Sequence, residues 1–167
     1  MAPKSNTAKV TLPLAVVGKT EVLHLIQEID ALDTFFAQAK IRSAGSAVVP
    51  PKLSQLLEEL AKQNDVNLIQ EESRKILKAG LEHIIAHAPT VHISFATTPS
   101  QRFLSKVTAW FRKEIHSDTL LQVGLQPSIA AGCMVRTTNK FFDLSLRRFL
   151  TGQTEKLASE FSGAKHG

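Results

Sequence analysis

The sequence has one cysteine, one tryptophan and no tyrosine among its 167 residues. A single cysteine excludes a disulfide within the chain, so we expect the protein to work in a reducing compartment. No apolar run approaches the roughly 20 residues that a membrane helix needs. The apolar stretch 10–17 follows two lysines, as in a signal peptide, but Thr11 and Pro13 interrupt it. We therefore expect no cleaved leader and a cytoplasmic protein.

The composition favours a packed protein with an acidic partner. Hydrophobic residues make up 43% of the chain, which is enough to form a core. The formal net charge is +5, with an isoelectric point near 9.5. This charge favours nucleic acid, anionic lipid or an acidic protein as partner, without choosing among them.

The first half of the chain has the pattern of a helical domain. Residues 1–18 are expected to form a flexible arm with a short apolar patch that can dock, and residues 19–88 a bundle of about three helices. Apolar residues recur at helical spacing over 22–36, 53–60 and 77–88. Thr20 is placed to cap the first helix, the second is expected from Pro51 and the third from about Leu68, and Pro89 ends the third.

In the second half the spacing of the apolar residues changes. The new pattern predicts a small β-α-β-β-α domain over 90–161, and residues 162–167 are expected to form a frayed tail. Alternating apolar residues predict strands over 91–96, 120–125 and 131–137. A helix that opens at Thr98-Pro99 separates the first two strands, which should run parallel, and the third should return antiparallel. A last helix is expected from near Asp143. The predicted fold class is therefore α+β. The helix face expected to pack on the sheet consists of Phe103, Val107, Trp110 and Phe111.

Motifs for phosphate or nucleophile chemistry are incomplete. Gly18-Lys19-Thr20 resembles the end of a P-loop, but the motif requires a glycine where this chain has Pro13. Cys133 falls on the apolar phase of a strand, which predicts a buried small hydrophobe and not a nucleophile. We therefore expect no catalytic residues and no cofactor.

A metal-dependent enzyme is the weakest alternative. His83 and His87 are four residues apart and share a helix face, as zinc ligands sometimes do. The residues between them include no glutamate, and His92 is only an arguable third ligand. We expect two partly exposed helix histidines and no metal site. Stoichiometric metal in untagged protein would contradict that expectation.

An RNA-binding or ribosome-associated adaptor is the main alternative function. The basic residues that could form a patch are Arg102, Lys106, Lys113, Arg147 and Arg148. However, the chain has no Gly-x-x-Gly clamp and no aromatic strand motif on which bases stack. A solvated basic face explains these residues, so no nucleic-acid partner is expected.

From Thr90 onward the chain resembles the C-terminal part of the delta subunit of F-type ATP synthase, the family that includes the oligomycin-sensitivity-conferring protein. The resemblance is densest over 126–147. It rests on Ile93-Ser94-Phe95-Ala96, Thr98-Pro99, Leu121-Gln122-Val123, Gln126-Pro127-Ser128-Ile129-Ala130-Ala131-Gly132, Val135-Arg136 and Phe142-Asp143-Leu144-Ser145-Leu146-Arg147. The helical part before Thr90 is shorter than the family's N-terminal bundle.

The resemblance implies a stator subunit that is not itself an enzyme. In this family the N-terminal bundle binds an N-terminal segment of an alpha subunit, and the C-terminal domain binds the b subunits of the peripheral stalk. The joint resists rotor torque, so that proton transport drives ATP synthesis. The protein would then lie at the inner face of the cell membrane through the complex, without inserting into the membrane.

Two groups of apolar residues are the candidate contacts. An amphipathic partner helix is held by apolar anchors at helical spacing. The candidates for the alpha subunit are Leu25, Ile29, Phe35 and Phe36. The candidates for the stalk are Phe141, Phe142, Leu146, Phe149 and Leu150. The alternative for the first group is that all four are ordinary core.

Overall fold

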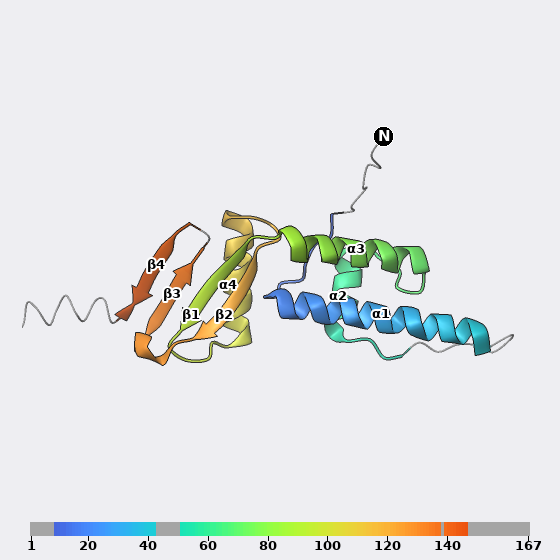
Figure 1. The fold of residues 1–167 in the computed structure, drawn as a ribbon, viewed down its shortest axis with the longest axis horizontal. Coiled ribbons are helices and arrows are strands. Elements are labelled where there is room, and N and C mark those ends of the chain that lie inside the picture. The colour runs from blue at the N-terminus through green and yellow to red at the C-terminus, as the bar shows by residue number, and fades with distance from the viewer. Residues whose placement is uncertain (1–8, 43–50, 138, 147–167) are drawn as a thin grey trace, which may run out of the picture. The chain divides into compact units, whose positions relative to one another are not determined.

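The computed structural model describes residues 9–42, 51–137 and 139–146 (Figure 1). Its helices are α1 (Lys19–Arg42), α2 (Gln55–Gln63), α3 (Glu71–His87), α4 (Gln101–Glu114) and the 3-10 turn η1 (Pro127–Ile129). Its strands are β1 (Thr90–Phe95), β2 (Leu120–Leu125), β3 (Gly132–Arg136) and β4 (Phe141–Ser145). The chain forms two compact units. The first contains residues 1–89 and Leu104–Leu120, and the second contains Thr90–Phe103 and the residues from Leu121 onward.

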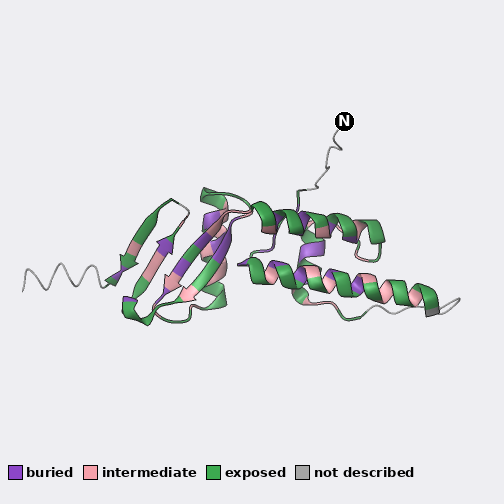
Figure 2. Cartoon of the chain, in the orientation of Figure 1, coloured by how far each residue is buried: buried purple, intermediate pink, exposed green. Residues whose placement is uncertain are grey.

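The three helices of the first unit pack around an aliphatic core. α1 and α3 run antiparallel, because Lys40 pairs with Glu71 while Asp30 pairs with Lys78. Buried residues recur along one side of each helix (Figure 2). The core consists of Val10, Leu12, Val16, Val22, Leu25, Ile29, Leu32, Leu57, Leu60, Leu77, Leu81, Ile84 and Leu120.

Two of these helices begin later than predicted. α2 begins at Gln55, because the Ser54 hydroxyl accepts a hydrogen bond from the Leu57 amide at 3.2 Å. This is the bond by which an N-cap side chain satisfies a free amide at the helix start. α3 begins at Glu71 with Gln70 as its N-cap.

Residues 9–18 are part of the first unit's core. Val10, Leu12 and Val16 are buried in the same cluster as the helices. The flexible arm was predicted to cover residues 1–18, and that range is too long. The apolar side chains within residues 9–18 dock on the helices, as was expected of the apolar patch. Residues 1–8 lie outside the described residues.

The side chains of Arg112 and Asn64 form hydrogen bonds to the backbone of the docked segment. Arg112, near the end of α4, donates to the carbonyl oxygens of Leu12, Pro13 and Val16 at 3.1, 2.9 and 2.6 Å. Its Nε donates to the carbonyl of Thr119 at 3.3 Å. Burial lowers the pKa of Arg112 from its usual value. These bonds explain why residues 104–120 belong with the helical unit, although the predicted boundary lay at 88–90.

The second unit contains a four-stranded mixed sheet in the order β2-β1-β3-β4. β1 and β2 run parallel, since the Leu120 amide donates to Pro89 and the Gln126 amide donates to Phe95. β3 is antiparallel to both β1 and β4. The mixed helix and strand content is that of the predicted α+β class.

The last predicted element is wrong at its start. Residues 141–145 form the edge strand β4, where a helix was expected from near Asp143. Helical backbone begins only at Leu146, whose amide donates to the Ala131 carbonyl at 2.8 Å. The remainder of the predicted helix lies outside the described residues.

Candidate interaction surfaces

The predicted contact residues on α1 are mostly not on the surface. Leu25 and Ile29 have 0% exposure, because they continue the buried stripe of Val22 and Leu32. A partner cannot contact either side chain in this conformation, so both belong to the core. Phe35 and Phe36 are half-buried and pack edge to face at 5.6 Å.

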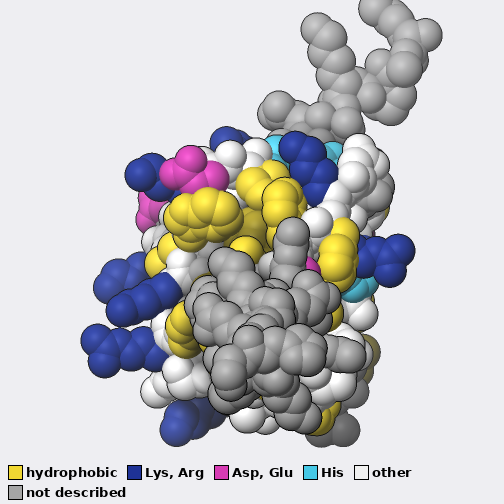
Figure 3. All heavy atoms as spheres, turned by 90° about the vertical axis from the view of Figure 1, so that its left-hand side faces the viewer, with side chains coloured by type: hydrophobic (Ala, Val, Ile, Leu, Met, Phe, Trp, Pro, Cys, Tyr) yellow, Lys and Arg dark blue, Asp and Glu magenta, His cyan; other side chains and the backbone are white. Residues whose placement is uncertain are grey.

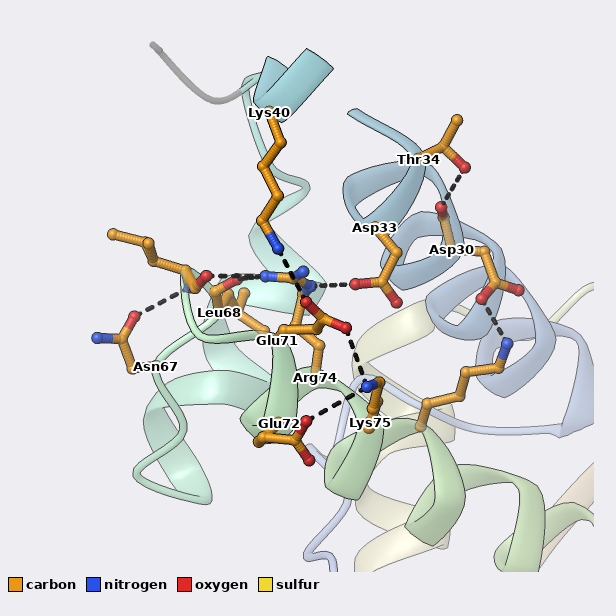
Figure 4. A network of polar contacts seen from close by, with 12 residues as sticks. Asp30, Asp33, Thr34, Lys40, Asn67, Leu68, Glu71, Glu72, Arg74 and Lys75 are labelled. Carbon is orange, nitrogen blue, oxygen red and sulfur yellow. Dashed lines mark hydrogen bonds and ion pairs between the residues drawn. The ribbon is translucent and has the colours of Figure 1, made fainter. Parts of the chain in front are cut away.

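Arg74 of α3 belongs to a network of polar contacts that includes Asp33 of α1 (Figure 4). The guanidinium of the buried Arg74 lies 4.7 Å from the centre of the Phe36 ring and is paired with Asp33. Arg74 also donates to the carbonyl oxygens of Leu68 and Ile69 at 2.8 and 2.9 Å. Phe36 therefore lies against a cation of its own chain and also packs against the hydrophobic core.

The predicted stalk contacts lie on an exposed apolar surface. Phe141 is 60% exposed, and Phe142, Leu144 and Leu146 are also exposed. We call these four residues the β4 apolar surface. Hydrophobic side chains gather at the β4 end of this unit (Figure 3). Phe149 and Leu150, the other two predicted contacts, lie outside the described residues.

The register of β4 places its aromatic side chains on opposite faces of the sheet. Phe141 lies beside Arg136, and Phe142 beside Val135. Val135 in turn lies beside Ile93, which is buried, so Phe142 extends the apolar face of the sheet. Opposite orientation was predicted from the alternation of an extended strand. Both rings are nevertheless exposed in the described structure.

An open hollow of about 410 Å³ lies at one end of the sheet. Its lining residues are Phe95, Ala96, Thr97, Pro99, Phe103, Ala130, Ala131 and Gly132. None of these side chains is acidic or basic, and Thr97 is the polar one among them. An apolar side chain of a partner is the ligand that such a lining fits best.

Cys133 lies half-buried on β3, and His83 and His87 lie side by side on α3. Burial raises the pKa of Cys133, which keeps the thiol protonated at neutral pH and therefore a poor nucleophile. The rings of His83 and His87 stack at 4.3 Å. In the described ranges, no three His, Cys, Asp or Glu residues are grouped so that they could hold a metal ion.

α4 differs most from its prediction. Phe111 is buried, but Trp110, which was expected to pack on the sheet, is 57% exposed. Phe103 packs edge to face against Phe95 of β1 at 5.9 Å, as expected, but its outer part is exposed. The exposed aromatics share a side of the helix with Arg102 and Lys106. Cations at that helical spacing were the sequence signal that this side faces solvent.

No family model matches the chain, and no curated protein matches it. Among the helices of the described residues, none has the length and apolar character required to cross a bilayer.

Proposed function

We propose that the protein is a non-catalytic scaffold that joins two partners, acting as the stator subunit of an F-type ATP synthase. One partner is the N-terminal segment of an alpha subunit, and the other is the b subunits of the peripheral stalk. The observation that carries the proposal is the β4 apolar surface. It lies within residues 126–147, where the chain resembles the delta-subunit family most densely.

The β4 apolar surface has the properties of a docking site. β4 is the edge of the sheet formed by the described residues, and edge strands with apolar side chains are prone to pair with another chain. Phe142 and Leu144 share one face of the sheet, and Phe141 lies on the other. Exposed apolar residues of this size on a protein surface mark interaction sites. We assign the stalk contact to Phe141, Phe142 and Leu146 within the described residues.

The alpha-subunit contact is narrower than the sequence predicted. With Leu25 and Ile29 in the core, only Phe35 and its neighbour Phe36 are at least partly accessible among the original candidates. We propose that Phe35 supplies the apolar contact of α1 to the alpha-subunit segment. Docking by apolar anchors depends little on long-range electrostatic attraction.

The test uses two single variants of the full chain and two purified partners. Phe141→Ser should abolish binding of the soluble b-subunit dimer and leave binding of an alpha N-terminal peptide intact. Phe35→Ser should do the reverse. Both variants should melt at the wild-type temperature, and the exposed Gln122→Ser serves as a control on the opposite edge strand.

The adaptor alternative is separated from the stator by what co-purifies at moderate salt. ATP synthase subunits should be retained as salt rises, because apolar contacts carry the binding. Retention of RNA alone, lost steeply with salt, would show that phosphate contacts carry the binding and would contradict the stator proposal.

A further inference from the structure

The outward side of α4 carries two parallel rows of side chains. Arg102, Lys106 and Lys113 are spaced by four and seven residues, which places them on one side of a helix. Phe103 and Trp110 are seven residues apart and form a second row beside the first. Both aromatics are exposed, whereas Thr108 and Phe111 on the opposite side are buried. We call these five residues the α4 outer face.

We propose that the α4 outer face docks an acidic amphipathic helix of a partner protein. This surface is separate from the β4 apolar surface and from Phe35, and the proposal stands without the stator assignment. α4 is one continuous helix, so the spacing along it is set by helix geometry alone.

The aromatic row fits the repeat of a second helix. Seven residues at a rise of about 1.5 Å place Phe103 and Trp110 about 10 Å apart along the axis. A partner helix presents apolar residues at the same heptad interval, so that both aromatics meet an anchor at once. Each ring is tied to the protein at one edge: Trp110 packs edge to face against Phe111 at 4.9 Å, and Phe103 against Phe95 of β1 at 5.9 Å. About half of each side chain remains exposed for a partner.

The basic row determines the charge of the partner. Among the described residues, no carboxylate lies within 4.0 Å of the charged groups of Arg102 and Lys106, and Lys113 reaches only the neighbouring Glu114 at 3.9 Å. Three cations with one weak intramolecular partner are matched by a row of Glu or Asp on the incoming helix. Such complementarity speeds encounter and selects against basic partners.

The arrangement favours a helix over a lipid surface. A helix that lies in a membrane interface needs a broad apolar face with cations on its polar side, inserted as a whole. The α4 outer face has only two aromatics, with the cations in a row along one edge of them. An acidic amphipathic helix presents a row of apolar residues to the two aromatics and a row of carboxylates to the three cations.

The fluorescence of Trp110 reports on this face alone, because it is the only tryptophan and the chain has no tyrosine. The probe is a synthetic helical peptide with Leu at heptad positions a and d and Glu at e and g. A second peptide carries Lys in place of every Glu. The acidic peptide should shift Trp110 emission to shorter wavelength and saturate, and the Lys peptide should cause no shift.

Charge reversal distinguishes docking from damage to the fold. The double variant Arg102→Glu/Lys106→Glu should bind the acidic peptide roughly tenfold more weakly or worse and should gain binding to the Lys peptide. Lys52→Glu, an exposed lysine outside α4, should bind as the wild type does. A variant that merely unfolds would not gain the second peptide.

Two further ligands complete the test: vesicles of phosphatidylglycerol with phosphatidylcholine, and polyuridylate RNA. If the vesicles or the RNA shift Trp110 while the acidic peptide does not, the proposed occupant is wrong. No shift with any ligand, or acidic-peptide binding that survives the double charge reversal, overturns the proposal as well.

Discussion

Gly132 lies at a position where the backbone of β4 leaves no room for a side chain. Its φ is +91°, and a Cβ placed there would lie 2.3 Å from the carbonyl oxygen of Leu144 and 3.1 Å from the Cα of Ser145. Both neighbours belong to the backbone of β4, so neither can move without disturbing the strand pair. A glycine in a strand often marks such a close approach of another backbone.

Gly132→Ala should therefore destabilise the second unit. Backbone strain at such a φ costs on the order of 1–3 kcal/mol, and the overlap with Leu144 adds to it. Gly124→Ala is the matched control, because its new Cβ would meet only the Ser94 hydroxyl at 3.4 Å. Thermal unfolding followed by circular dichroism should show a lower midpoint for Gly132→Ala only. Equal midpoints for both variants would mean that β4 does not hold this close register.

Glu71 is the acidic residue with a large shift in the described structure. Hydrogen bonds from Lys75 and then Lys40, together with their charges, lower its pKa from 4.5 to about 2. A lowered pKa in the folded state means that the carboxylate stabilises the fold fully above pH 4.5. That contribution is lost as the pH falls from 4.5 through 2.

Between pH 5 and 2, the wild type should lose stability through this site, whereas Glu71→Gln should not lose that component. Because Glu71 and Lys75 are exposed, added salt should screen the pair and move the pKa of Glu71 back toward its ordinary value. Carboxyl-carbon NMR titration at low and high salt measures the shift directly. A titration midpoint near 4.5 at low salt would show that the two lysines do not hold Glu71.

At the scale of elements, α4 shows that two residues of similar hydrophobicity can differ in burial. Trp110 and Phe111 are adjacent and both aromatic, yet only Phe111 is enclosed, at 6% exposure. Phe111→Ala should cost about 3–5 kcal/mol, because it empties a packed site. Trp110→Ala should cost only about 1 kcal/mol, the loss of its edge-to-face contact with Phe111. Urea unfolding of the two variants checks the pair, and similar losses would place Trp110 in the core after all.

Local patterns predicted most elements well. Val91, Ile93 and Phe95 alternate with more accessible residues along β1, so period two marked that strand correctly. The prediction of a helix from near Asp143 was wrong because Asp143 and Ser145 are typical helix-capping residues. There, pairing with β3 overrides the local preference, and Asp143 instead accepts a hydrogen bond from the Ser145 amide.

The candidate site was predicted less well, for a physical reason. Leu25, Ile29 and Phe141 have the same chemical character in the sequence, but the first two are enclosed by other segments and the third is not. Such enclosure depends on contacts between residues far apart in the chain. Arg112 is an example of such a long sequence separation, because the carbonyl oxygens to which it donates lie about 100 residues earlier.

At the scale of the whole molecule, the chain passes between its two units more than once. It leaves the helical unit after Pro89, returns at Leu104 within α4, and leaves again after Leu120. The helical unit is therefore built from two separate stretches of sequence. The sequence-based boundary near 89 divides the chain at the first crossing and omits the second stretch.

This path predicts that a fragment of residues 1–89 does not fold as the full chain does. The fragment lacks Leu120, whose 0% exposure places it in the helical core, and a loss of this size alone costs about 2–5 kcal/mol. It also lacks Arg112, so three carbonyl oxygens of the docked segment lose their donor. Since a small domain has only about 5–15 kcal/mol in total, these losses should remove its cooperative melting.

A fragment of residues 1–120 is the matched control, because it restores both contacts without the rest of the sheet. It should melt cooperatively in calorimetry and show dispersed amide signals by NMR, whereas the 1–89 fragment should do neither. If the shorter fragment melts as sharply and at the same temperature as the longer one, Arg112 and Leu120 do not hold the helical unit together. In that case the docked segment 9–18 must be retained by α1, α2 and α3 alone.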